Sequence, residues 1–281
     1  MKFLRWPLLG LLWFMASSLF AQYPEFEVEI KGKGTPVLLF PGFSCTSEVW
    51  DTTVQQISEQ YECHVFTFAG FGNVPPVEGN WLLRIKNAVK KYMYEKNMYH
   101  TVLIGHSMGG TLALWLGLEE QSRLEKIIVV DALPAMGALM IPDFDPDYIT
   151  YDNPYNQQLL KMDDVAFKNM VSNMAAFMSK NQDYHKQLTD WMVQADRKTY
   201  VYGYTDLLKL DIRKELSGLK IPVVILAATF PDKEAVIKNY KAQYTALPYK
   251  TFYYAENAAH FIMYDDPEWY SEKIEEQLPV K

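Results

Sequence analysis

The sequence has little positive charge. Its 281 residues include 27 Lys and Arg against 34 Asp and Glu, a formal net charge of -7. An acidic chain binds nucleic acids and anionic membrane surfaces poorly, so we expect neither as a partner. The sequence also lacks the ligand spacing of metal sites and a complete dinucleotide-binding loop, since the Gly70-Phe71-Gly72 stretch has neither a third glycine nor an acidic partner. We therefore expect no metal and no cofactor.

Long apolar runs are equally scarce. Lys2 and Arg5 precede a short apolar run, residues 8–14, which small residues follow up to Ala21. This layout predicts a signal peptide, residues 1–21, and a mature protein that is periplasmic or secreted, without stable membrane insertion. The competing interpretation is an uncleaved anchor, but the run is short for a full span and lacks a basic stop. Cleavage would leave 25 basic against 34 acidic residues.

Runs of strand length alternate with segments of helical spacing over most of the remaining chain. Strands are predicted at 26–30, 36–40, 63–68, 101–104, 126–130, 221–227 and 251–254, and helices at 47–59, 81–94, 233–244 and after Pro267. The first two strands resemble a hairpin at the entry to a mixed sheet. The regular alternation that follows predicts an α/β fold with a mostly parallel, doubly wound sheet and right-handed crossovers.

The alternation breaks after the strand that ends near Asp131. Residues 135–210 contain no such strand and are rich in methionine and aromatic residues at helical spacing. We therefore predict a core of residues 22–134 and 211–281, with a helical lid inserted at 135–210.

Cysteine occurs only at positions 45 and 63. An exported protein would be expected to pair them. However, Cys45 follows the C-terminal end of one predicted parallel strand, and Cys63 begins the next. Those ends lie about a strand's length apart, on the order of 15 Å, which no disulfide bridges. We expect two free thiols.

The stretch 101–114 combines an apolar strand, a tight turn and the start of an apolar helix. At its tip Ser107 lies between Gly105 and Gly109, in the pattern G-x-S-x-G. A side chain at either glycine would collide where helix and strand cross behind the serine. This arrangement strains the serine backbone and exposes its hydroxyl, as a nucleophile requires.

With these pieces in order, the chain resembles the α/β-hydrolases over nearly all of its mature length. The matching segments are 36–43 with Trp50 downstream, Gly70-Phe71-Gly72, 105–110, 211–222 and 258–261. The resemblance implies acyl transfer through a covalent intermediate on Ser107. Relatives that open haloalkanes or epoxides use a carboxylate at this position, so that chemistry is disfavoured.

A serine nucleophile needs a base, and the resemblance places it at His260, after the last predicted strand. Ala259 replaces the usual preceding glycine. His106 adjoins the serine, but neighbouring side chains on such a turn diverge, so we interpret it as a packing residue. The remaining histidines, at positions 64, 100 and 185, are interpreted as structural.

The third member of a catalytic triad is an acid that orients the histidine. The family that the chain resembles most often carries this acid just after the strand that follows the insertion. Asp232 lies in the corresponding loop, about one residue later than the family's usual position, and the loop lacks the common glycine. Asp131 is the alternative, and it also preserves the order serine, acid, histidine. The sequence favours Asp232.

An oxyanion hole needs two preorganised donors. The N–H of Met108, just after the nucleophile, is one, and Phe43 in the loop after the 36–40 strand matches the other. Pro41-Gly42 stands where the family commonly has His-Gly.

These residues predict an exported serine hydrolase that cleaves an ester of a small or medium apolar acyl group, a small-molecule substrate. Hydrolysis of an amide, thioester, lactone or carbon–carbon bond stays open within the same machinery. A non-catalytic binding protein on the same fold is the alternative from another class. The sequence does not indicate an oligomeric state.

Overall fold

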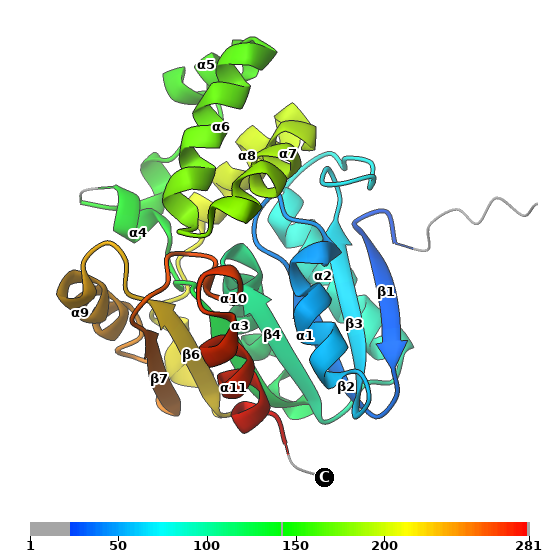
Figure 1. Ribbon diagram of the computed structural model, residues 1–281. Helices are drawn as coiled ribbons and strands as arrows, with labels where there is room; N and C mark the ends of the chain where they lie inside the picture. The colour runs from blue at the N-terminus through cyan, green and yellow to red at the C-terminus, as the bar shows by residue number, and fades with distance from the viewer. Residues whose placement is uncertain (1–22, 142, 280–281) are drawn as a thin grey trace, which may run out of the picture.

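The computed structural model describes residues 23–141 and 143–279. Seven strands form one sheet in the order β1-β3-β2-β4-β5-β6-β7 (Figure 1), in which β1 is antiparallel to β3 and all other neighbours are parallel. The strands are β1 (Phe26–Gly32), β2 (Thr35–Phe40), β3 (Tyr61–Phe68), β4 (Thr101–His106), β5 (Leu124–Val130), β6 (Val223–Ala228) and β7 (Lys250–Ala255). The predicted α/β fold class is confirmed.

The expected hairpin at the start of the chain is wrong. Strands β1 and β2 are consecutive in sequence, but β3 lies between them and pairs with both, antiparallel to β1 and parallel to β2. Gly32 and Gly34 therefore carry the chain across one strand position. β1 is an edge strand whose residues after the buried Phe26 are mostly exposed, whereas the central strand β4 is buried throughout.

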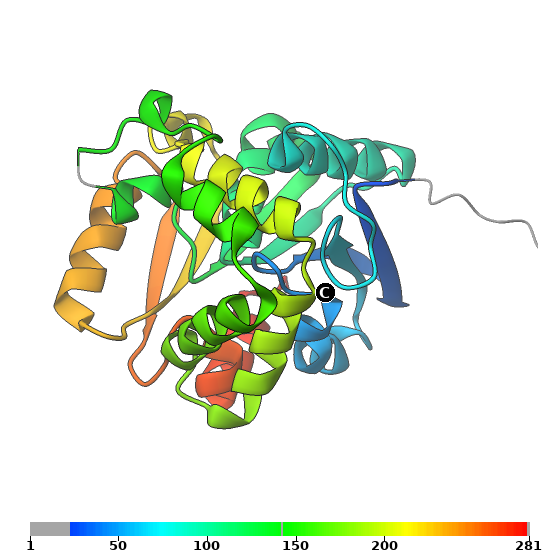
Figure 2. The same ribbon diagram turned by 90° about the horizontal axis from the view of Figure 1, so that it is seen from above.

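Helices α1 and α11 lie on one face of the sheet and α2 and α3 on the other, as the two views show (Figures 1 and 2). The core helices are α1 (Asp51–Ile57), preceded by the 3₁₀ turn Ser47–Trp50, α2 (Trp81–Glu95), α3 (Met108–Glu120), α9 (Lys233–Gln243), α10 (Ile262–Asp265) and α11 (Pro267–Gln277). Shorter 3₁₀ turns cover Gln121–Arg123 and Glu215–Gly218. Within the described ranges, no helix is both long and apolar enough to cross a membrane.

The segment between β5 and β6 is helical, as predicted. It contains α4 (Gly137–Met140), α5 (Pro154–Lys161), α6 (Asp164–Met178), α7 (His185–Gln194) and α8 (Arg197–Lys209), with 3₁₀ turns at Pro146–Tyr148 and Gln182–Tyr184. We call this segment the cap. Seen from above, the cap helices cross over the sheet (Figure 2). Cys45 and Cys63 are buried free thiols.

Candidate active site

Ser107 occupies the tight turn between β4 and α3. Its backbone angles, φ 54° and ψ -126°, are strained for a residue with a side chain. The turn is possible because its flanking residues are glycines. A Cβ on Gly105 would lie 2.2 Å from the carbonyl oxygen of Gly109, and one on Gly109 would lie 2.2 Å from that of Phe40. Helix and strand therefore approach closely, and the Ser107 side chain projects beyond the sheet into a cavity.

His260 lies in the loop after β7 and lines the same cavity as Ser107. Its Nδ1 atom is 2.6 Å from Oδ2 of Asp131, which follows the last residue of β5. Both side chains are mostly buried, with 19% of His260 and 13% of Asp131 exposed. A carboxylate at Nδ1 directs the other ring nitrogen, Nε2, away from it and fixes the neutral tautomer with its proton on Nδ1.

The structure places the two candidate acids in different surroundings. Asp232 is exposed and caps α9, where its Oδ1 accepts a hydrogen bond from the N–H of Ala235. Capping is the common role of an aspartate just before a helix. The carboxylate that meets His260 belongs to Asp131, the alternative that the sequence had ranked second.

His106 lies beneath this pair and is fully buried. Its Nε2 donates a hydrogen bond to the carbonyl oxygen of His260, at 3.0 Å, and the two rings are 4.7 Å apart between centroids. Burial, reinforced by the neighbouring His260, holds the pKa of His106 well below the ordinary histidine value. His106 is therefore a neutral support under the backbone of His260.

The loop after β2 passes over Ser107. A Cβ added to Gly42 would lie 2.8 Å from Nδ1 of His106 and 3.3 Å from Cβ of Ser107, so only glycine fits there. The Phe43 ring packs against four aromatic side chains, which fixes the loop: Phe71, Trp81, Tyr200 and Tyr204.

Two main-chain N–H groups beside Ser107 are available as donors. Met108 is the first residue of α3, so the helix supplies no acceptor for its N–H. For the N–H of Phe43, the part of the chain that the structure describes offers no main-chain acceptor either. Ser44, the next residue, has a positive φ of 64°, which marks a sharp bend of this loop.

Asp265, in α10, ties the histidine loop to the cap and was missed by the sequence reasoning. Its carboxylate accepts hydrogen bonds from the N–H of Ala259 and from the Ser179 hydroxyl, 2.7 and 2.6 Å long. The N–H of Phe261 donates to the carbonyl oxygen of Met178, at the end of α6. No pattern in the sequence links these segments, because they meet only through the tertiary fold.

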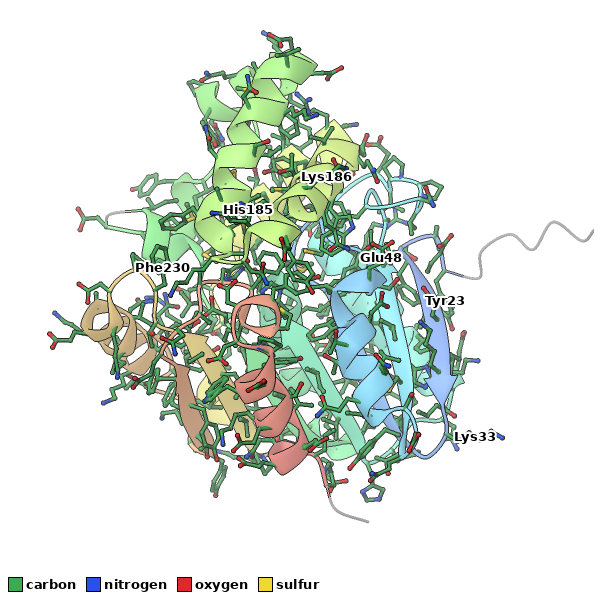
Figure 3. All side chains as sticks on the ribbon, viewed as in Figure 1. Tyr23, Lys33, Glu48, His185, Lys186 and Phe230 are labelled. Carbon is green, nitrogen blue, oxygen red and sulfur yellow. The ribbon has the colours of Figure 1, made fainter. Side chains whose placement is uncertain are left out.

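The cap and the core also meet through two aromatic side chains. Phe177 of α6 packs against Phe230, which follows β6, with ring centroids 5.5 Å apart. Figure 3 labels Phe230 at the boundary between the core and the cap, and His185 within the cap. The cap is thus joined to the core on both sides of the His260 loop.

A cavity of about 550 Å³ separates Ser107 and His260 from the cap. Six methionines line it, at positions 136, 140, 170, 174, 178 and 192, together with Tyr148, Tyr155, Tyr200 and Tyr204. Methionine adapts its shape to a bound apolar group. Two exposed carboxylates, Asp143 and Asp145, also reach the lining. A cavity of this size and composition accepts a small, mainly apolar organic molecule.

The sheet order, the serine turn and the cap together define an α/β-hydrolase fold. The sequence pattern of the "Alpha/beta hydrolase family" matches residues 37–273. The chain belongs to this family.

Two curated relatives illustrate the range of similar proteins. A pimeloyl-[acyl-carrier protein] methyl ester esterase of Aeromonas salmonicida is 28% identical over 205 residues, covering 70% of this chain and 77% of the relative. The 3-oxoadipate enol-lactonase 1 of Acinetobacter baylyi is 24% identical over 211 residues, or 72% of this chain and 74% of the relative.

Solved structures share the fold. A thermophilic esterase from Thermogutta terrifontis superposes with a TM-score of 0.75 at 18% identity, covering 89% of this chain and 92% of the other. The enol-lactonase from Burkholderia xenovorans LB400 gives a TM-score of 0.74 at 14% identity, and the superposition covers 89% of this chain and 95% of the other.

Proposed function

We propose that the protein is a serine esterase whose triad is Ser107, His260 and Asp131. The observation that carries the proposal is the hydrogen bond from His260 to Asp131, together with the cavity that His260 and the strained turn of Ser107 both line. The names of the relatives, an ester esterase and an enol-lactonase, agree with cleavage of an ester bond.

In the proposed mechanism Ser107 Oγ attacks the ester carbonyl while His260 Nε2 takes its proton. Asp131 holds the Nδ1–H and stabilises the imidazolium that forms. The N–H groups of Phe43 and Met108 donate hydrogen bonds to the oxyanion of the tetrahedral intermediate. His260 then protonates the leaving alcohol, and the acyl group stays on Ser107 Oγ. Water, deprotonated by His260, releases the acid and restores the serine.

The lining of the cavity favours an apolar acyl group as the part of the substrate that contacts the cap. The methionine side chains can follow a flexible chain, and the mainly apolar lining suits an acyl chain better than a sugar or a polyphosphate. We therefore assign a small to medium, uncharged acyl chain to the cavity.

Turnover of p-nitrophenyl acetate, butyrate, octanoate and palmitate tests the proposal. We expect the highest kcat/KM for butyrate or octanoate and loss of turnover in Ser107→Ala. A fluorophosphonate probe should label the wild-type protein and not this variant. An unlabelled wild-type protein that still binds fatty acids would contradict the proposal and favour a non-catalytic binding protein.

We also propose export, with cleavage after Ala21. The signal peptide lies outside the described residues, so the support is the sequence pattern and the position of Tyr23, whose ring already packs against Phe26 and Tyr92. Tyr23, the second residue after the proposed cleavage site, therefore belongs to the buried core. N-terminal sequencing of the protein recovered from the exported fraction should begin at Gln22. A chain that retains Met1 in the membrane fraction would favour the anchor.

A further inference from the structure

Helix α9 and its C-cap residue present three buried polar side chains on one face, Tyr240, Gln243 and Tyr244, as their spacing of three and four residues requires. All three hydrogen bond to the segment 131–135, which follows β5 and begins with the acid of the proposed triad. Tyr244 donates to the carbonyl oxygen of Ala132, at 2.7 Å. Gln243 pairs with both the N–H and the carbonyl oxygen of Ala135.

Tyr240 differs from the other two because it reaches a side chain. Its hydroxyl donates to Oδ1 of Asp131, at 2.7 Å, and the N–H of Ala228 donates to the same oxygen, at 2.9 Å. Oδ2 of the same carboxylate meets Nδ1 of His260. Two donors on one oxygen therefore fix the rotation of the carboxylate and leave the other oxygen directed at the histidine.

The Tyr240 hydroxyl can only act as a donor in this position. Burial, together with the charge of Asp131, raises the pKa of Tyr240 well above its ordinary value, so the hydroxyl keeps its proton. A hydrogen bond to a charged acceptor in a buried site is stronger than one between neutral groups.

The backbone of Asp131 explains why such support is needed. Its φ of 45° lies in the left-handed region, which costs free energy for most residues other than glycine, although aspartate adopts it more readily than most. Such a conformation persists when surrounding contacts over-determine it. Side chains of α9 and its C-cap hold the 131–135 segment through hydrogen bonds. This helix follows the loop after β6, where the family most often carries its acid.

We infer that Tyr240 is a positioning residue that acts through Asp131 and adapts the site to an acid placed after β5. This inference rests on the proposed triad. It makes α9 part of the catalytic architecture, although none of its side chains lines the cavity.

A double-mutant cycle distinguishes this role from a merely structural one. We expect Tyr240→Phe to lower kcat for a p-nitrophenyl ester about tenfold with little change in KM, because it loses a hydrogen bond to a charged group. In an Asp131→Ala background, the same substitution should lower the residual kcat less than about twofold, since Tyr240 then has no carboxylate to orient.

Tyr244→Phe is the matched control. It also removes a buried tyrosine hydroxyl from the same face, but that hydroxyl donates to a main-chain carbonyl oxygen and not to Asp131. Any effect of Tyr244→Phe should be the same in both backgrounds. Equal effects of Tyr240→Phe in the two backgrounds, or none in the wild type, would overturn the inference.

Proton NMR provides a readout that does not depend on ester turnover. The downfield resonance of the His260 Nδ1 proton should shift or broaden in Tyr240→Phe and stay in place in Tyr244→Phe. An unaltered resonance in Tyr240→Phe would overturn the inference even if the protein cleaves esters. If wild-type protein cleaves no ester and the resonance still responds as expected, the proposed function fails and the positioning of Asp131 stands.

Discussion

Nδ1 of His260 and Oδ2 of Asp131 lie 2.6 Å apart, although 129 residues separate them in the sequence. The pair comes from the ends of β5 and β7, with β6 between them in the sheet. Asp131, which follows β5, thus lies one strand nearer to β4 and Ser107 than Asp232, which follows β6.

The two aspartates give opposite predictions for activity. Asp131→Asn should lower kcat by about 10⁴-fold, because an amide no longer holds the required histidine tautomer. Asp232→Asn should change kcat less than about twofold, since asparagine also caps α9. Hydrolysis of a p-nitrophenyl ester by both variants is the measurement. A slow Asp232→Asn beside a fast Asp131→Asn would restore Asp232 as the acid.

Gly42 tests the close contact above the serine. Gly42→Ala places a methyl group against His106 and Ser107, and we expect kcat to fall about a hundredfold from the resulting displacement. Gly218→Ala is the control, because nothing lies within 4 Å of its added Cβ. Kinetics and thermal unfolding of both variants provide the comparison. Equal activity of the two would contradict the tight packing at Gly42.

Acidification should destabilise the protein through its buried histidines. Burial lowers the pKa of both His106 and His64 below the ordinary value of 6.5. The unfolded chain therefore binds more protons than the folded one as the pH falls below about 6.5, and the free energy of unfolding decreases by up to about 1.4 kcal/mol per pH unit for each histidine. Above that pH the loss is absent.

Urea unfolding at pH 7 and pH 5 measures this effect. His106→Gln should reduce the loss of unfolding free energy between these pH values by about 2 kcal/mol. An undiminished loss in His106→Gln would show that His106 is protonated in the folded state.

The carboxylates at the cavity predict discrimination by substrate charge. Asp143 and Asp145 line the cavity, so an ester whose acyl chain ends in a carboxylate should react more slowly than its neutral methyl diester. The double variant Asp143→Asn/Asp145→Asn should reduce this preference about threefold at low salt, because exposed charges interact weakly and are screened. Asp183→Asn, elsewhere in the cap, is the control. If the double variant keeps the full preference for the neutral ester, Asp143 and Asp145 are not its cause.

Local sequence was sufficient for the elements and for the serine turn. The alternation of apolar strands and amphipathic helices follows from which faces are buried, and the helix predicted at 81–94 is observed as Trp81–Glu95. The turn at Ser107 could be predicted because Gly105 is required by a contact with Gly109, four residues along the chain. These are short-range constraints, and each leaves a pattern within a few residues.

The order of the first three strands in the sheet and the choice of carboxylate that contacts His260 depend on long-range contacts, which leave no local pattern in the sequence. Residues 26–30 and 36–40 have the patterns of two strands, but insertion of β3 between them depends on which edges of the sheet stay open after the whole chain has packed. Likewise Asp131 and Asp232 each follow a buried strand, and the position of the loop in the sequence favoured Asp232. Only the fold turns one toward His260 and Tyr240 and the other toward the N-terminus of α9, because a carboxylate's partners are set by its three-dimensional neighbours.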